Sequence, residues 1–144
     1  AAGITAPVIG QEGYDGFKFI EIAGPDAEGV IITTSLDRDS TDPLVVNFMK
    51  GFAAKAGYPA DMVGASSHTA VLVLASAMKT AGTSDRTALR DAISKTKLVA
   101  STGTIAFNEL GEVIKDVQVQ VVRDGGWHHH SVISDSKLLA PPNK

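Results

Sequence analysis

Residues 7-PVIGQEGYDG-16 place a glycine and then a carboxylate directly after a short apolar run. Val8-Ile9 predicts a short strand that ends at Gly10, and Glu12 follows in a glycine-flanked loop. Glutamate is most often a solvated loop residue. In open α/β sheets, however, ligands bind beyond the carboxyl ends of the strands, so an acid held here would face a ligand. The residues of this stretch alone leave both interpretations of Glu12 open.

The segments that follow alternate between strand and helix patterns. The β-branched run 30-VIITT-34 predicts a second strand, and Asp42-Pro43 predicts a helix start by an N-cap followed by proline. Asp124-Gly125-Gly126 predicts a hairpin turn. Helices are predicted over residues 14–22, from 43 to 57, 61–81 and 86–96, a strand over 102–108, a loop over 109–115, a hairpin over 117–133 and a frayed end over 139–144. This order indicates an α/β fold.

The helix predicted over residues 61–81 is apolar nearly all round in its second half, which predicts packing on more than one side. Its longest apolar stretch, 69-TAVLVLASAM-78, is too short to span a bilayer. Ser84 or Asp85 is expected to cap the next helix, and Lys95 and Lys97 are expected near its basic C-terminus.

Composition excludes several classes of function. The 144 residues are 44% hydrophobic and 20% charged, which is typical of one soluble globular domain. The net charge of −3 comes without a basic stripe, so nucleic acid is not an expected partner. Cysteine is absent, which excludes a disulfide framework and a thiolate site. The first ten residues lack the pattern of a targeting peptide, so we expect such a peptide to be removed or to lie upstream.

Several segments, taken in order, carry a family resemblance. They are 8-VIGQEG-13, 23-AGPDAEGVIITT-34, 55-KAGYPAD-61, an alanine-rich helix, 102-TGTIAFNELGEVIKDVQV-119 and 121-VVRDGGW-127. Over roughly residues 6–128 the chain resembles the C-terminal part of periplasmic branched-chain amino-acid-binding proteins, the solute receptors of ABC importers. Each segment is made of common residues, and their shared order makes the resemblance specific.

The resemblance implies a Rossmann-like periplasmic-binding-protein fold, three-layer αβα with a C-terminal β-hairpin. Family members are more than twice as long and have two lobes, so the resemblance implies an incomplete chain. Residues 1–33 and 117–133 would belong to the second lobe, residues 36–115 to the first, and 134–144 to a tail. A missing N-terminal part or another chain would complete the two cores, and a swapped oligomer is the alternative.

The resemblance also suggests ligand-binding residues. In the family, the acid at the position of Glu12 accepts hydrogen bonds from the ligand's ammonium, and Gly13 allows close backbone approach. Gln11 is a weaker candidate for the same cleft. Val63 matches a position that lines the pocket for the ligand's side chain. Tyr14 is a candidate for stacking, and His68 stands where the family often has tyrosine, which leaves the ligand's identity open.

The resemblance therefore implies a non-catalytic periplasmic receptor without a cofactor. It would bind a branched-chain amino acid, or a related amino-acid-like or aromatic acid, and deliver it to a membrane permease. With half a cleft, the chain alone is expected to bind weakly. A ligand-sensing domain of the same fold is the alternative.

Other readings of the residues are weaker. A small enzyme would use Glu12 and His68 as an acid and base pair within about 7 Å of each other. A metal site at His128-His129-His130 is disfavoured, because neighbouring side chains on a strand point to opposite faces. The sequence also lacks a nucleophile elbow and a phosphate-binding glycine motif.

Overall fold

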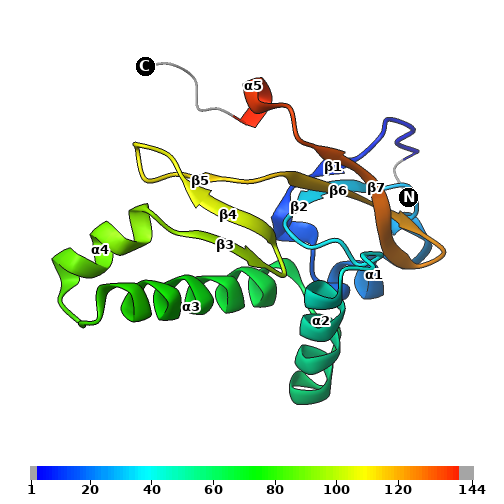
Figure 1. The fold of residues 1–144 in the computed structure, drawn as a ribbon. Coiled ribbons are helices and arrows are strands. Elements are labelled where there is room, and N and C mark those ends of the chain that lie inside the picture. The colour runs from blue at the N-terminus through cyan, green and yellow to red at the C-terminus, as the bar shows by residue number, and fades with distance from the viewer. Residues whose placement is uncertain (1–2, 140–144) are drawn as a thin grey trace.

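A computed structural model describes residues 3–139 of the chain as two β-sheets with helices beside them (Figure 1). The elements, in order, are β1 (Ile9–Gly10), η1 (Glu12–Tyr14), α1 (Phe17–Ala23), η2 (Gly24–Ala27), β2 (Ile31–Thr34), α2 (Pro43–Ala56), α3 (Met62–Ala81), α4 (Arg86–Ser94), β3 (Lys97–Ala100), β4 (Gly103–Phe107), β5 (Val113–Ile114), β6 (Val117–Arg123), β7 (Gly126–Ile133) and α5 (Ser136–Leu139). The mixed order of helices and strands agrees with the predicted α/β class.

The first sheet has the strand order β1-β2-β6-β7. β1 runs parallel to β2, whereas β2, β6 and β7 are antiparallel neighbours. Asp124 and Gly125 connect β6 to β7 with φ values of 51° and 74°. Two successive positive φ values are the geometry of a tight hairpin turn that matches strand twist. The predicted hairpin is therefore confirmed.

A hydrophobic core forms against this first sheet. The alternation of β2 turns Ile32 inward, and its side chain is fully buried. Phe19 of α1 stacks on Trp127 of β7 with ring centroids 5.9 Å apart. The buried members of this cluster are Ala27, Val30, Ile32, Val122 and Trp127. The core thus joins segments from both ends of the chain.

The second sheet, β3-β4-β5, is antiparallel, and α3 and α4 lie along it (Figure 1). A hydrogen bond of 3.0 Å between the buried hydroxyls of Thr69 and Thr102 joins α3 to the turn before β4. The chain leaves the first sheet after β2 and returns to it at β6. Residues 35–42 lead from β2 into α2 and so toward the second sheet, and residues 115–116 lead from β5 back to β6.

Side-chain caps set the starts of the long helices. Asp42 accepts a hydrogen bond of 2.8 Å from the Leu44 amide at the start of α2, and Asp85 accepts one of 2.9 Å from the Ala88 amide at the start of α4. Such caps satisfy amides that have no partner within the helix. Gly57 ends α2 in the left-handed conformation with φ of 79°. These predicted boundaries are confirmed.

Three elements differ from the sequence prediction. β3 was not predicted: Lys97 was expected near the end of the preceding helix, but residues 97–100, two residues after α4, pair with β4. β5 lies inside the predicted loop 109–115 and pairs with β4 over only two residues. α1 begins at Phe17 and not at Tyr14, because the preceding residues form the separate 3₁₀ turn η1. Residues 140–144 of the predicted frayed end lie outside the described residues.

The prediction that α3 packs on several sides is wrong for the described part of the chain. Its buried residues recur every fourth position, at Ala65, Thr69, Val73 and Ala77. Val71 and Leu74 on the other sides are 65% and 45% exposed. None of the described elements covers that apolar face. Within residues 3–139, no helix combines the length and the apolar character that a membrane crossing requires.

Candidate functional site

A cleft of about 310 Å³ lies between the loop after β1 and the start of α3. Glu12 and Gly13 line one side, and Met62 and Val63 line the other. The remaining lining residues are Gln11, Asp15, Gly16 and Asp61. The structure therefore brings four of the six candidate residues, Gln11, Glu12, Gly13 and Val63, into one cleft, although some fifty residues separate the two sides.

The loop that carries Glu12 is a turn held by its own hydrogen bonds. The Gly13 amide donates to the Gln11 side-chain oxygen at 3.2 Å, and the Tyr14 amide donates to the Gln11 carbonyl at 3.0 Å. The Tyr14 ring packs directly over Gly10, where a β-carbon would lie 2.1 Å from the ring. Glycine at position 10 is thus required by the close approach of Tyr14. Gln11 thus has a structural role within the loop, in addition to lining the cleft.

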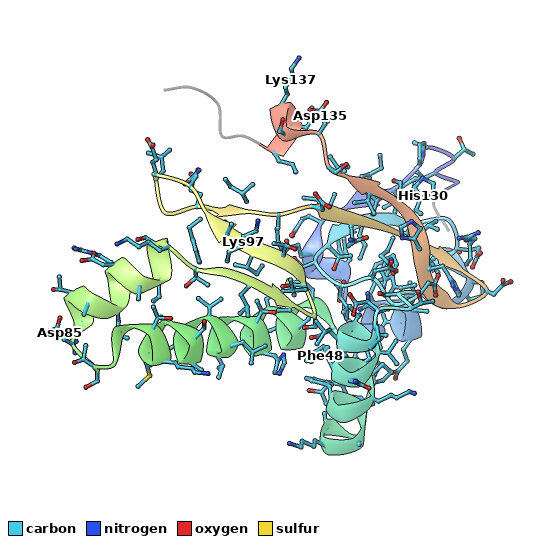
Figure 2. All side chains as sticks on the ribbon, in the orientation of Figure 1. Phe48, Asp85, Lys97, His130, Asp135 and Lys137 are labelled. Carbon is cyan, nitrogen blue, oxygen red and sulfur yellow. The ribbon has the colours of Figure 1, made fainter. Side chains whose placement is uncertain are left out.

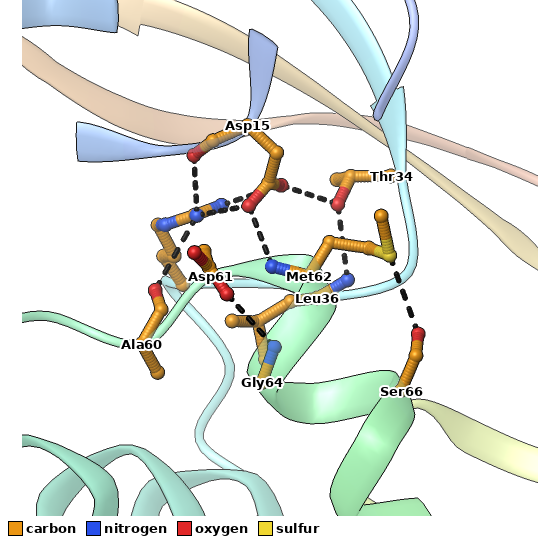
Figure 3. A network of polar contacts seen from close by, with 9 residues as sticks. Asp15, Thr34, Leu36, Ala60, Asp61, Met62, Gly64 and Ser66 are labelled. Atoms are coloured by element: carbon orange, nitrogen blue, oxygen red, sulfur yellow. Dashed lines mark hydrogen bonds and ion pairs between the residues drawn. The ribbon is translucent and has the colours of Figure 1, made fainter. Parts of the chain in front are cut away.

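A buried ion pair fixes this loop against the rest of the molecule (Figure 3). Asp15, which is 1% exposed, accepts hydrogen bonds from Arg38 through both carboxylate oxygens, at 2.6 and 3.2 Å. Its carboxylate also accepts a hydrogen bond from the Thr34 hydroxyl and one of 2.7 Å from the backbone amide of Met62, the first residue of α3. Charge-assisted bonds of this kind are stronger than neutral ones. Asp15 therefore holds η1, the end of β2 and the start of α3 together.

The sequence patterns did not indicate Asp15 or Arg38 as site residues. Asp15 stands three residues after Glu12, and Arg38 stands in a polar loop 23 residues further on. Neither belongs to a short motif. The available signal is weak. An acid soon after β1 and an arginine four residues after β2 can meet at the same edge of the sheet, where these parallel strands end.

Asp61, the third carboxylate of the cleft, caps α3 by accepting a hydrogen bond of 2.8 Å from the Gly64 amide. Arg38 neutralises Asp15, and Asp61 is engaged at the helix start. Glu12 accepts no hydrogen bond from another side chain within residues 3–139. Of the three carboxylates, the Glu12 side chain is therefore the one left open to a partner in the cleft.

The charge of Glu12 affects the pKa of one nearby cation, Lys115. It lies in the connection between β5 and β6 and donates a hydrogen bond to the Ser35 hydroxyl, directly after β2. Burial lowers the pKa of the Lys115 ammonium below its ordinary value of 10.5, and the negative charge of Glu12 opposes that shift. Lys115 itself lines a different cavity, together with Thr69 and Val73.

Two candidate residues lie outside this cleft. Tyr14 packs on Phe19 with centroids 5.2 Å apart, so its ring faces the first core. The ring centroids of His68 and Phe48 lie 5.0 Å apart, and Phe48 is a residue of α2 (Figure 2). His68 lines a separate cavity of about 430 Å³ between α2 and α3. Glu12 and His68 therefore line different cavities, which gives no support to the acid and base pair.

The histidine run contacts the connection between the sheets. His128 Nδ1 lies 3.2 Å from the carboxylate of Asp39, and His129 Nδ1 lies 3.3 Å from that of Asp37. The backbone amide of His129 donates a hydrogen bond to Asp39, and this bond is the largest cause of the lowered pKa of the Asp39 carboxyl. The register of β7 shifts at His130, so strict alternation of the run does not apply. Within the described residues, no group of three or more His, Cys, Asp or Glu side chains is placed to hold a metal ion.

The sequence of residues 1–126 matches the family model for a periplasmic binding protein. The chain belongs to the periplasmic binding protein family. This assignment covers both sides of the cleft and confirms the resemblance found in the sequence. Members of the family bind solutes for ABC transporters and are not enzymes, so the prediction of a non-catalytic protein is confirmed.

Individual relatives agree with the family. The chain is 28% identical over 114 residues to Leu/Ile/Val-binding protein homolog 3 of Brucella melitensis, covering 78% of this chain and 30% of that protein. A leucine-binding protein from Thermotoga maritima is 29% identical, with a TM-score of 0.83 over 94% of this chain and 39% of that one. A leucine-, isoleucine-, valine-, threonine- and alanine-binding protein from Brucella ovis, in a closed conformation, shares the fold at 19% identity, with a TM-score of 0.84 over 97% of this chain and 40% of that one. The predicted binding-protein fold is confirmed, and the chain spans between 30% and 40% of the length of these three relatives.

Proposed function

We propose that this chain is the C-terminal part of a receptor that captures a small amino-acid-like solute in a cleft between two lobes, for import by an ABC transporter. The observation that carries this proposal is the cleft itself, which sets the unpaired Glu12 carboxylate opposite Val63. The proposed ligand is a branched-chain amino acid, or a related amino-acid-like or aromatic acid. The names of the Brucella melitensis and Thermotoga maritima relatives support the first of these.

Glu12 would accept hydrogen bonds from the ammonium group of the ligand. Moving an ammonium out of water costs several kcal/mol unless a charged partner meets it. A carboxylate provides charge-assisted hydrogen bonds that offset this cost. Gly13 lines the cleft beside Glu12 without a side chain that would obstruct the ligand.

Val63 would contact the apolar part of the ligand. It lies in the first turn of α3, lines the cleft and is 63% exposed. Covering a valine side chain with an apolar ligand group removes hydrocarbon surface from water and stabilises the complex by about 1 kcal/mol or more. An acid on one wall and a valine on the other suit a molecule with an ammonium end and a hydrocarbon end.

The two sheets suggest how a complete receptor closes. We propose that residues 1–33 and 117–133 belong to the second lobe, residues 36–115 to the first and residues 134–144 to a tail. The residues between these ranges, 34–35 and 116, would then act as hinge segments. Ligand contacts with both lobes would favour closure. This chain carries one part of those contacts, so its own affinity should be weak.

Proposed partners follow from the same arrangement. The exposed apolar side chains of α3, Val71 and Leu74 among them, would be covered by an N-terminal part of the receptor or by a second copy of this chain. The complete receptor would act in the periplasm and deliver its solute to the permease of an ABC importer. Membership of the periplasmic binding protein family supports this location.

The function is tested by a thermal-shift screen of amino acids and aromatic acids on a full-length protein that carries this chain, repeated with Glu12→Gln. A branched-chain amino acid should raise the melting temperature of the unmodified protein. Glu12→Gln should reduce the affinity by about tenfold or more, because a charge-assisted bond becomes a neutral one. Equal stabilisation of both proteins would refute the role of Glu12, and stabilisation by none of the compounds would refute the proposed ligand class.

A further inference from the structure

A hydrogen bond between Asp15 and Met62 crosses the cleft. Asp15 lines the side that carries Glu12, and Met62 lines the opposite side. The carboxylate of Asp15 accepts this bond, of 2.7 Å, from the backbone amide of Met62 (Figure 3). The Asp15 amide donates to the Glu12 carbonyl at 3.1 Å, so the acceptor belongs to the same turn as Glu12. A direct bond therefore joins the two walls of the cleft.

Both partners of this bond gain from it. Met62 is the first residue of α3, a position whose amide has no acceptor within a helix. Asp15 is 1% exposed, so its carboxylate depends on protein donors. A carboxylate at the start of a helix is also stabilised by the helix dipole. The bond thus favours the arrangement in which the two walls lie together.

The two partners belong to different lobes in the proposed division of the chain. Asp15 falls in residues 1–33 of the second lobe, and Met62 falls in residues 36–115 of the first. Arg38 lies only three residues beyond the hinge segment 34–35, and its long side chain can follow Asp15 as the lobes separate. The Met62 amide is fixed in the backbone of α3 and cannot follow. Opening of the cleft would therefore break the bond from Met62 to Asp15.

We propose that Asp15 is a positioning residue that holds the cleft closed, through its hydrogen bond to the Met62 amide, before a solute binds. This inference rests on the proposed function, because it assigns the two walls of the cleft to different lobes. Asp15 acts through Met62 and raises the population of the closed arrangement, in which Glu12 and Val63 face each other. A receptor whose binding-competent form is more populated has a lower apparent dissociation constant for its solute.

The test replaces Met62 by proline or by alanine and measures the distance between the lobes without any solute. Both substitutions remove the methionine side chain, but only proline also removes the amide. Proline is well tolerated at the first position of a helix. Asp61, which precedes it, already has the extended backbone that a residue before proline adopts, with φ of −118° and ψ of 177°. The comparison of Met62→Pro with Met62→Ala therefore isolates the hydrogen bond.

Spin labels report the distance. The chain contains no cysteine, so labels can be confined to Ser84→Cys and Ser131→Cys. Ser84 follows the far end of α3, Ser131 lies in β7, and both are exposed. The 20 residues of α3 span about 30 Å, so a small rotation at its start displaces Ser84 measurably.

Double electron–electron resonance on the labelled 144-residue chain should give one narrow distance distribution, and Met62→Ala should keep it. In Met62→Pro we expect a second distance component, with the ratio of open to closed chains raised about tenfold by the loss of one charge-assisted hydrogen bond. A broad distribution in the chain with native Met62 would overturn the inference. Identical distributions in the proline and alanine variants would also overturn it.

A second pair of variants decides the question if circular dichroism shows that Met62→Pro has lost helix relative to Met62→Ala. Asp15→Asn removes the charge of the acceptor and should also produce the second component. Asp91→Asn is its control, because Asp91 pairs with Arg90 inside α4 and joins no two lobes. The same distribution in both asparagine variants would then overturn the inference.

The outcome is independent of solute capture, because no solute is added. If the distances do not respond but a branched-chain amino acid stabilises the full-length protein, only the role of Asp15 is refuted. If the distances respond as expected but no compound stabilises the full-length protein, the proposed ligand class is refuted and the bond to Met62 stands.

Discussion

Arg38→Met should lower the free energy of unfolding by about 3 kcal/mol, because it leaves the buried carboxylate of Asp15 without its charged partner. Methionine keeps most of the apolar stem of Arg38, so the loss comes from the guanidinium. That group donates to both carboxylate oxygens and, at 2.9 Å, to the carbonyl of Asp15. Urea denaturation followed by circular dichroism measures the change.

Arg90→Met is the matched control for this prediction. Arg90 also forms a 2.6 Å ion pair, with Asp91, but the two side chains are 73% and 54% exposed. Exposed pairs contribute about 0–1 kcal/mol, so this variant should unfold at nearly the same urea concentration as the unmodified chain. Similar losses for both arginines would show that burial of Asp15 does not determine the strength of its pairing.

Gly10→Ala should destabilise the chain by about 2 kcal/mol and displace the loop that carries Glu12. A β-carbon at position 10 would lie 2.1 and 2.5 Å from two carbons of the Tyr14 ring, so the ring must move. Tyr14 belongs to η1 together with Glu12, and its movement would alter the wall of the cleft. Urea denaturation gives the stability change, and amide shifts of η1 report the movement.

Gly16→Ala separates this effect from a general intolerance of alanine. Gly16 has a φ of −66°, and an added β-carbon would meet no atom within 4 Å. Gly16 is the N-cap of α1, where alanine is less favourable than glycine, so that variant should cost about 0.5–1 kcal/mol, less than Gly10→Ala. In the double variant Gly10→Ala/Tyr14→Ala, removal of the ring should abolish the additional cost of alanine at position 10. If it does not, the close approach of Tyr14 is not the reason for glycine there.

Local signals predicted much of the secondary structure. Helix ends and tight turns depend on the conformational preferences of single residues. The structure accordingly has a helix boundary at Asp42 and at Gly57, and a turn at Asp124-Gly125. β3 and β5 escaped prediction because they are short and gain their stability from pairing with β4. Pairing partners cannot be read from a four-residue or two-residue segment.

The site was predictable only in part, for a related reason. The position of Glu12 after a strand, together with the family resemblance, predicted one wall of the cleft and also Val63. The buried pair of Asp15 and Arg38 depends on two loops meeting at the end of β2, which no local pattern encodes. The hydrogen bond from Lys115 to Ser35 could not be predicted for the same reason, because it joins residues 80 positions apart in the sequence.

The burial of α3 was also predicted only in part. Its apolar composition predicted packing on several sides, whereas the described part of the chain covers only the side that contains Val73 and Ala77. An exposed apolar helix face is typical of a surface that another part of a protein or a partner covers. The structure of one chain shows only the surfaces buried within that chain.

The central claim is that Glu12 receives the ammonium group of the solute. A crystal structure of a full-length protein carrying this chain, grown with leucine, tests it most directly. We predict that a carboxylate oxygen of Glu12 lies about 2.7–3.2 Å from the leucine nitrogen, with Val63 against the ligand's side chain. A bound leucine whose nitrogen is held by other groups, with the Glu12 side chain turned into solvent, would contradict the account.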